Sequence, residues 1–214
     1  MTGTITAIEL QKRDKDRVNV YLDHHFAFSL SALRAASLKR GQYLSDEAIR
    51  TLRAHDDGEQ AHDQALNYLT YRPRSEAELE GYLARKGWDE AVVREVIERL
   101  KQAGLVDDRE FARFWVENRQ RFRPRGRMAL RYEMKTKGLS EEDISESLET
   151  VDEETSAYAL ALVQVRKKAG LAPRELRQKL GQYLARRGFS YSVVATVLRR
   201  IAAEEQSQDE GDRS

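Results

Sequence analysis

Hydrophobic and polar residues follow two different periods along this chain, and the period changes near residue 60. Before that point, the stretches TITAIEL, RVNVYL and HFAFSL alternate apolar with polar residues, which is typical of half-buried strands. The link KRDKDR suits a hairpin turn, and Ser45 is placed to cap a short helix over DEAIRTL. Residues 1–60 are therefore predicted to form a β-hairpin or meander followed by a short helix.

Beyond residue 60, apolar residues recur three and four positions apart, which is the spacing of one helix face. The pattern occurs three times, and each copy contains a basic residue followed by glycine, at Gly87, Gly138 and Gly188. Apolar residues stand at five shared offsets: eight and four before each glycine, and six, ten and thirteen after it. A proline also precedes each glycine by fourteen or fifteen residues. Such agreement indicates an internal repeat.

Each copy is predicted to contain a helix, a proline-marked loop, a helix that ends at the glycine, and a third helix. Glycine ends a helix because it takes the left-handed conformation at low cost. The fold class is therefore mainly α, with three tandem three-helix repeats in an elongated, curved array after the small antiparallel β segment. The expected repeats are residues 61–106, 107–152 and 153–203, and the acidic residues 204–214 are expected to be disordered.

The distribution of charge adds a functional signal to this predicted fold. The formal net charge of +1 conceals segments of the sequence, here called bands, in which side chains of one sign predominate. Residues 119–138 carry eight basic side chains and one acidic one, and residues 166–200 carry ten basic and one acidic. Between them, residues 140–154 carry eight acidic side chains and no basic one. Two basic bands of this strength suit a polyanion such as DNA or a DNA-coated filament.

The repeat shows that the fold does not require this charge. Arg127, Arg131 and Lys135 are four residues apart and form one stripe on a predicted helix. The same positions hold Glu76, Glu80 and Ala84 in the first copy, and Arg177, Gly181 and Ala185 in the third. We therefore favour a binding role for the basic bands over solvated helix faces. An acidic protein surface would suit guanidinium groups equally well.

The candidate binding residues are the cations of the two bands. The basic pairs that close helices are weaker candidates, since cations are favourable at helix C-termini for the helix dipole alone. The full set is Arg119, Arg121, Arg123, Arg125, Arg127, Arg131, Lys135, Lys167, Lys168, Arg174, Arg177, Arg186 and Arg187.

Signals for catalysis are absent from the sequence. The chain has no cysteine, which excludes disulfides, a thiolate nucleophile and cysteine-bound zinc. It has no GxxxxGK loop and no serine in a nucleophile elbow. His55 and His62, near Asp56, could form a weak metal site, but solvated linker histidines are the favoured interpretation. We expect no enzyme activity, no cofactor and no metal.

Other short patterns favour structural roles. Asp107 is expected to be an N-cap with Glu110 as its capping-box partner, so the acidic pair at 107–108 indicates helix capping. Phe122 lies between two arginines and could stack on a base, whereas the aromatic residues before it have helical spacing typical of a core. No secretory signal is seen and the apolar run AYALALV is far too short to span a bilayer, so a soluble cytoplasmic protein is expected.

The middle copy resembles the bacterial RecX regulatory proteins. DDREFARFWVENR, followed by RPRGRMALRYEMKTKGL, carries their pattern at Asp107, Asp108, Phe111, Ala112, Arg119, Gly126, Lys137 and Gly138. SEAELEGYLARKG of the first copy and the three-copy layout also fit, and the resemblance covers roughly residues 60–203. One departure is Tyr132-Glu133-Met134, where the family often has a glutamate-leucine pair.

The resemblance implies a monomeric regulator of the RecA recombinase. Such proteins lie in the groove of the RecA–single-stranded DNA filament and suppress its ATPase, strand-exchange and co-protease activities. The implied partners are the RecA filament and single-stranded DNA, contacted directly or through RecA, with no membrane involved. On this view, reversing Arg125, Arg127 and Arg131 to glutamate weakens inhibition. Two alternatives stay open: a nucleic-acid-binding repeat protein that acts without RecA, and a scaffold for acidic protein partners.

Overall fold

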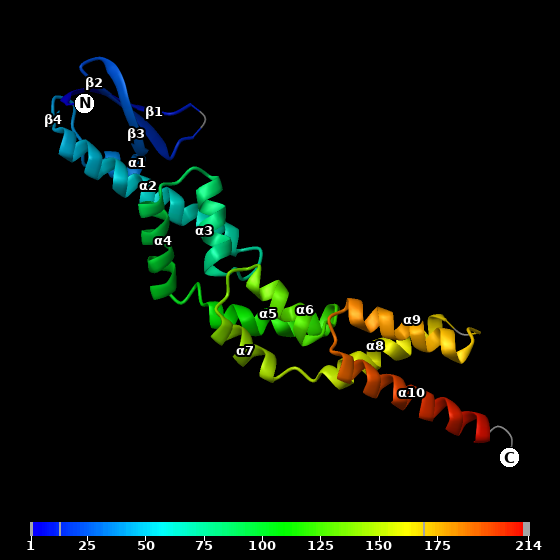
Figure 1. Cartoon of the computed structure of the whole chain (residues 1–214). Coiled ribbons are helices and arrows are strands. Elements are labelled where there is room, and N and C mark those ends of the chain that lie inside the picture. The colour runs from blue at the N-terminus through cyan, green and yellow to red at the C-terminus, as the bar shows by residue number, and fades with distance from the viewer. Residues whose placement is uncertain (1, 13, 169, 212–214) are drawn as a thin grey trace. The chain divides into compact units, whose positions relative to one another are not determined.

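The computed structural model describes residues 2–12, 14–168 and 170–211, with side chains described as far as residue 204 (Figure 1). The chain divides into two compact units. Unit 1 contains residues 1–72 and 79–105, and unit 2 contains residues 73–78 and 106–214.

Unit 1 begins with a four-stranded antiparallel sheet in the order β3-β2-β1-β4. Its strands are β1 (Gly3–Leu10), β2 (Arg17–Leu22), β3 (His25–Ser31) and β4 (Tyr43–Leu44). The three alternating stretches of the sequence are therefore confirmed as strands. Two elements are too short to produce a periodic pattern of apolar residues in the sequence. They are the two-residue β4, which pairs with the start of β1, and the four-residue helix α1 (Ala32–Ala35).

The turn between β2 and β3 consists of two residues with positive φ. His25 belongs to β3, whereas the adjacent His24 does not. Asp23 and His24 form the turn, with φ angles of 48° and 69°. A two-residue hairpin turn of the type that matches strand twist requires positive φ at both positions, and Asp and His accept it more readily than most residues.

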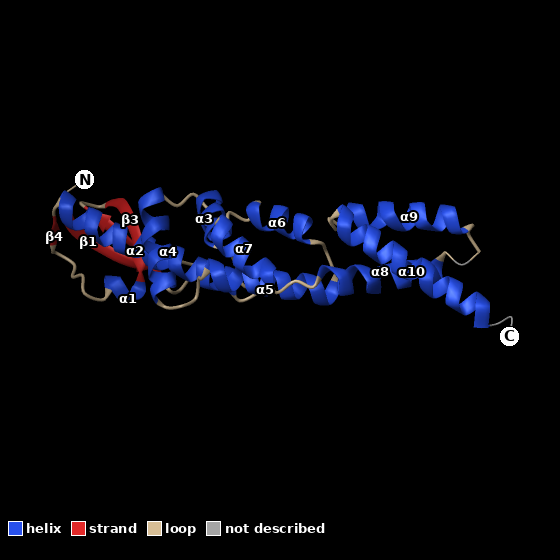
Figure 2. Cartoon of the chain, turned by 60° about the horizontal axis from the view of Figure 1, so that its bottom comes forward, coloured by secondary structure: helices blue, strands red, loops and turns tan. Residues whose placement is uncertain are grey.

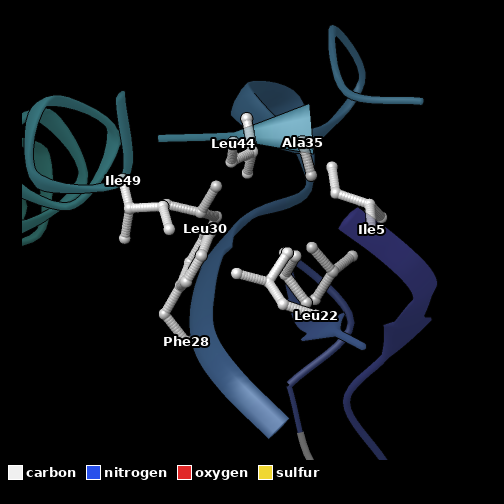
Figure 3. Packing of buried hydrophobic residues seen from close by; sticks show 9 residues of the cluster. Ile5, Leu22, Phe28, Leu30, Ala35, Leu44 and Ile49 are labelled. Carbon is white, nitrogen blue, oxygen red and sulfur yellow. The ribbon is translucent and has the colours of Figure 1, made fainter. Parts of the chain in front are cut away.

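Alternate residues of the strands point into one apolar core, shown in Figure 3. Ile5, Val20 and Leu30 are almost completely buried there. Leu44 of β4 and Ile49 of α2 (Asp46–Leu69) close the cluster. The alternation read from the sequence thus corresponds to one buried face of the sheet.

Helix α2 runs for 24 residues from the Ser45 cap, so the expected boundary at residue 60 lies inside a continuous helix. Asp56 is a buried charged residue, only 2% exposed, and it links α2 to the sheet. Its carboxylate accepts bonds from Arg17 Nη2 at 2.9 Å, Ser31 N at 2.7 Å and Gln60 Nε2 at 2.7 Å. This aspartate, which the sequence placed near a weak metal site, has a structural role.

The first repeat consists of α2, α3 (Glu76–Arg85) and α4 (Glu90–Gln102). Tyr68 of α2 and Tyr82 of α3 stack with ring centroids 4.1 Å apart. Trp88, just after the helix-ending glycine, donates from Nε1 to Gln64 at 3.1 Å.

Unit 2 contains the other two repeats, whose helices are blue in Figure 2. They are α5 (Asp108–Phe122), α6 (Arg127–Lys135), α7 (Glu141–Glu149), α8 (Glu153–Lys167), α9 (Pro173–Arg186) and α10 (Tyr191–Gly211). Three-helix repeats are therefore confirmed. Pro173 is the first residue of α9 rather than part of a loop. Helix α10 extends to Gly211, into the segment expected to be disordered; residues 212–214 lie outside the described residues.

The shared apolar offsets are core positions in all three repeats. Fourteen of the fifteen residues at these offsets are buried, and the exception is Leu198, which is half-buried. Clusters built on Leu130 and Met134, and on Leu180 and Leu184, form the cores of the second and third repeats.

Within unit 2, which includes residues 73–78, backbone groups at the ends of α6 form hydrogen bonds with residues of the neighbouring repeats. Gly126, the N-cap of α6, donates from its backbone nitrogen to the Arg187 carbonyl at the end of α9, at 3.0 Å. The Ser75 hydroxyl, just before α3, donates to the Lys137 carbonyl at the end of α6, at 2.7 Å. Each junction thus satisfies a carbonyl that a helix C-terminus leaves without an intrahelical partner.

Glycine is required at these junctions for a second reason beyond its positive φ. A Cβ atom on Gly188 would overlap Ala129 and lie 2.5 Å from the Ala129 nitrogen. A Cβ on Gly138 would overlap the Ala77 methyl group. At Gly87, which ends α3, a Cβ would meet nothing within 4 Å. The helix-ending glycine is therefore a packing requirement only where another repeat lies against it.

Candidate basic interface of the second and third repeats

The arginine and lysine stripe on α6 is ion-paired within its own repeat. Arg131 Nη1 contacts Glu141, and Lys135 Nζ lies 2.9 Å from the same carboxylate. Arg127 donates from Nη2 to the Val151 carbonyl at 2.7 Å and from its backbone nitrogen to Glu153 at 2.8 Å. All three cations keep partial solvent exposure, yet each has an internal partner.

A second cluster gathers two further candidates around Glu133 of α6. Arg119 Nε donates to Glu133 at 2.7 Å, and Arg125 Nε lies 3.6 Å from the other carboxylate oxygen. The Arg119 guanidinium also lies 4.4 Å from the ring centroid of Trp115, whose Nε1 donates to Glu133 at 2.9 Å. These contacts give Arg119 and Arg125 structural roles within the repeat.

The pairing has a simple origin in the repeat fold. The acidic band at 140–154 includes α7 and the start of α8, and α7 packs against both α5 and α6. Folding therefore brings the acidic band beside the first basic band. Glu146 of α7 likewise bonds Arg109 and Arg113 of α5, and these hydrogen bonds hold the pKa of Glu146 below its usual range.

Eight of the thirteen candidates have no carboxylate partner among the described residues. They lie at the end of α5, at the end of α8, and on α9 and its C-terminal turn, and most are exposed. Arg187 is the most constrained, because its guanidinium lies 5.1 Å from the Tyr183 ring centroid and 3.5 Å from the Pro124 carbonyl oxygen. The eight are Arg121, Arg123, Lys167, Lys168, Arg174, Arg177, Arg186 and Arg187.

The structure separates Phe122 from the other aromatic residues of α5. Phe111 is buried, and Trp115 stacks on it at a centroid distance of 5.9 Å. Phe122 is 66% exposed, with the Arg121 guanidinium 5.2 Å from its ring centroid. An exposed ring beside unpaired arginines is the arrangement that stacks on a nucleic-acid base.

The acidic pair at 107–108 caps two helices rather than one. Asp107 accepts from the Glu110 nitrogen at 3.0 Å and caps α5, as the sequence predicted. Asp108 accepts from the Glu76 nitrogen at 2.8 Å and caps α3, which sequence spacing could not indicate.

Over the parts of the chain that the structure describes, no three His, Cys, Asp or Glu residues are grouped to hold a metal ion. No described helix is long and apolar enough to cross a membrane.

Sequence analysis did not single out two further residues near the candidate cations of the third repeat. Arg199 of α10 lines a hollow together with Arg177, and Tyr191 at the start of α10 is 89% exposed. Comparing all three copies position by position could have found Tyr191, because the first two copies have glutamate there, at Glu90 and Glu141.

Comparison with known proteins covers most of the chain. Residues 3–45 match the family described as the regulatory protein RecX N-terminal domain. Residues 61–100, 107–148 and 152–198 match the first, second and third three-helix domains of RecX.

Curated proteins from several bacteria that are similar to this chain carry the name regulatory protein RecX. One from Bacillus licheniformis is 34% identical over 94% of this chain and 78% of its own length. One from Clostridium perfringens strain 13 is 31% identical over 95% of this chain and 98% of its own length. These names denote a regulatory protein, in agreement with the expectation of a non-catalytic role.

Two solved structures have the same fold. A crystal structure of regulatory protein RecX matches 91% of this chain and 98% of its own, with a TM-score of 0.68 and 29% identity. The crystal structure of RecX from Lactobacillus salivarius matches 70% of this chain with a TM-score of 0.64 and 23% identity, which supports the fold alone.

Proposed function

This chain belongs to the RecX family of regulatory proteins, and on that premise we propose that it binds the RecA–single-stranded DNA filament and inhibits it. The inhibited activities would be ATP hydrolysis, strand exchange and co-protease function, so the protein would modulate recombination and DNA repair. It would act by occupying the filament, without catalysing a reaction.

The observation that carries this proposal is the set of eight unpaired cations on the second and third repeats. Folding neutralises Arg127, Arg131 and Lys135 with the acidic band, but leaves the ends of α5 and α8 and the face of α9 positive. Cations without a carboxylate partner lose no ion pair when they bind an external anion. A filament that contains single-stranded DNA includes phosphates at regular spacing.

The ion pairs also change the choice of test variant. Reversing Arg125, Arg127 and Arg131 would place new carboxylates beside Glu133, Glu153 and Glu141. Like charges at those distances destabilise the fold, so a loss of inhibition would be ambiguous. Substitutions belong instead at exposed, unpaired positions.

The test is to replace Arg121 and Arg123 with glutamine and to measure inhibition of RecA ATP hydrolysis on single-stranded DNA. The matched control replaces Arg85 and Lys86, an exposed basic pair at the end of α3, and removes the same charge. Losing two ionic contacts of about 0.7 kcal/mol each should raise the half-inhibiting concentration about tenfold. The control should stay within about twofold of the unaltered protein. Equal inhibition by both variants would remove Arg121 and Arg123 from the interface.

A nucleic-acid-binding module that acts without RecA is the second candidate, favoured by exposed Phe122 beside Arg121. It requires tight binding of the isolated protein to single-stranded DNA, with affinity falling steeply as salt rises. Fluorescence anisotropy with labelled oligothymidylate at several salt concentrations measures this directly. Tight DNA binding together with unchanged RecA turnover would favour the module over the filament inhibitor.

A further inference from the structure

The third repeat lacks an ion-pair cluster that the second repeat has. In the second repeat, Arg131 and Lys135 of α6 both pair with Glu141, the first residue of α7. The corresponding positions of the third repeat hold Gly181, Ala185 and Tyr191. All three charged partners are replaced together, two of them by the smallest residues.

This replacement leaves an open apolar groove between α9 and α10. A cavity of about 590 Å³ is lined by residues that include Gly181, Ala185, Val194 and Leu198. A second hollow of about 360 Å³ continues past Leu198 to Ala202 of α10. Leu198 is the one repeat-core position that stays half-buried, because no side chain extends over it from Gly181.

The rim of the groove is basic. Arg174 and Arg177 line one part of it, and Arg199 lines the continuation. In the described part of the third repeat, none of these guanidinium groups pairs with a carboxylate. Glu175 is engaged by Lys179 at 2.7 Å, and Glu204 is engaged by Arg200 and Tyr158.

We propose that this groove binds an acidic, amphipathic peptide segment of a partner protein. Its apolar side chains would pack over Gly181 and Ala185 against Leu198, and its carboxylates would pair with Arg174, Arg177 and Arg199. A helix carrying apolar anchors three and four residues apart fits a groove between two helices. Guanidinium groups bind carboxylates in a bidentate manner, which adds specificity to an apolar contact.

The lining favours a peptide over nucleic acid. The groove floor is aliphatic, and Phe189 is 3% exposed, so Tyr191 is the exposed ring at its edge. Single-stranded nucleic acid binding depends on stacking of successive bases on aromatic side chains. This inference goes beyond the proposed function, because the partner it names need not be RecA. Arg174 and Arg177 belong to both surfaces, whereas Arg121 and Arg123 belong to the proposed filament interface alone.

The test uses a fluorescein-labelled helical peptide of about 16 residues, with leucines along one face and glutamates elsewhere. The key variant transplants the cluster of the second repeat, as Gly181→Arg, Ala185→Lys and Tyr191→Glu. We expect the unaltered protein to bind the peptide, and the transplant to weaken binding at least tenfold by filling the groove. A peptide with serines in place of leucines should also bind at least tenfold more weakly.

A second variant keeps the proposal testable if the triple variant does not fold. Ala185 is exposed on α9, so Ala185→Glu leaves the core intact while placing a carboxylate at the groove edge. It should repel the acidic peptide and retain the circular dichroism spectrum. Replacing Arg174 and Arg177 with glutamine should weaken peptide binding and make the binding affinity less dependent on salt concentration.

Three results would overturn the assignment. One is equal peptide binding by the unaltered, transplanted and Ala185→Glu proteins. Another is loss of oligothymidylate binding by these variants with peptide binding intact, which would assign the groove to nucleic acid. The third is a concentration-dependent dimer, seen by sedimentation velocity, that Ala185→Glu converts to a monomer. Inhibition of RecA by Arg121→Gln/Arg123→Gln protein is a separate readout, so failure of either proposal can be distinguished.

Discussion

Replacing Gly188 with alanine tests how the second and third repeats are joined. Gly188 has φ +81° and lies against Ala129 of α6. Alanine there meets two costs: left-handed backbone, about 1–2 kcal/mol, and overpacking at the junction, about 1–3 kcal/mol. The expected loss in the free energy of unfolding is therefore about 2–5 kcal/mol.

Gly170→Ala is the matched control, because Gly170 lies in the same repeat with φ +96° and open space around its Cα. It meets the backbone cost without the overlap, so it should lose only about 1–2 kcal/mol. The smaller entropy of the unfolded chain with alanine applies to both variants and cancels in their difference. The excess loss at Gly188 thus measures the packing of α9 against α6.

The assay is urea unfolding followed by tryptophan fluorescence in a Trp88→Phe background. The protein has two tryptophans, and this change leaves Trp115 of unit 2 as the reporter. Gly188→Ala should reduce the free energy of unfolding by at least about 1 kcal/mol more than Gly170→Ala does. Equal losses for the two variants would refute the close contact between the repeats.

Three further outcomes are expected. Asp56→Ala should reduce the stability of unit 1 by about 3 kcal/mol in urea unfolding reported by Trp88, because it leaves Arg17 without its buried partner. Gly181→Ala should increase the stability of unit 2 by about 0.5–1 kcal/mol in urea unfolding reported by Trp115, since a methyl group there makes ordinary contact on a helix. Hydrogen bonds from Tyr158 and then Arg200 lower the pKa of Glu204 from 4.5, so its stabilising contribution is present above that pH and is lost as pH falls through the lower value. Tyr158→Phe should raise the Glu204 pKa toward 4.5 in a carboxyl titration followed by NMR.

Repetition made much of the fold predictable. An apolar residue that recurs at one offset in three copies must serve a shared role, and fourteen of fifteen such positions are buried. The exception is Leu198, whose partial exposure could not be predicted from its being a leucine at a shared offset. Its exposure depends on Gly181, seventeen residues earlier, which contributes no side chain to cover it.

Charge was less predictable because bands along a sequence need not remain bands in space. Arg131 and Glu141 lie in bands of opposite sign, yet the turn after α6 brings them into contact. The same limit applies to Asp108, whose partner Glu76 is 32 residues away. Local capping rules identified Asp107 as a helix cap, because its partner is three residues away. They cannot identify a cap whose partner lies in another repeat.

The most direct test of filament inhibition measures occupancy and turnover in one sample. The protein would be titrated into RecA–single-stranded DNA filaments, with bound protein followed by co-sedimentation and ATP hydrolysis followed in parallel. The hydrolysis rate should fall in proportion to bound protein, and Arg121→Gln/Arg123→Gln should shift both curves together. Full occupancy of the filament with an unchanged hydrolysis rate would contradict filament inhibition.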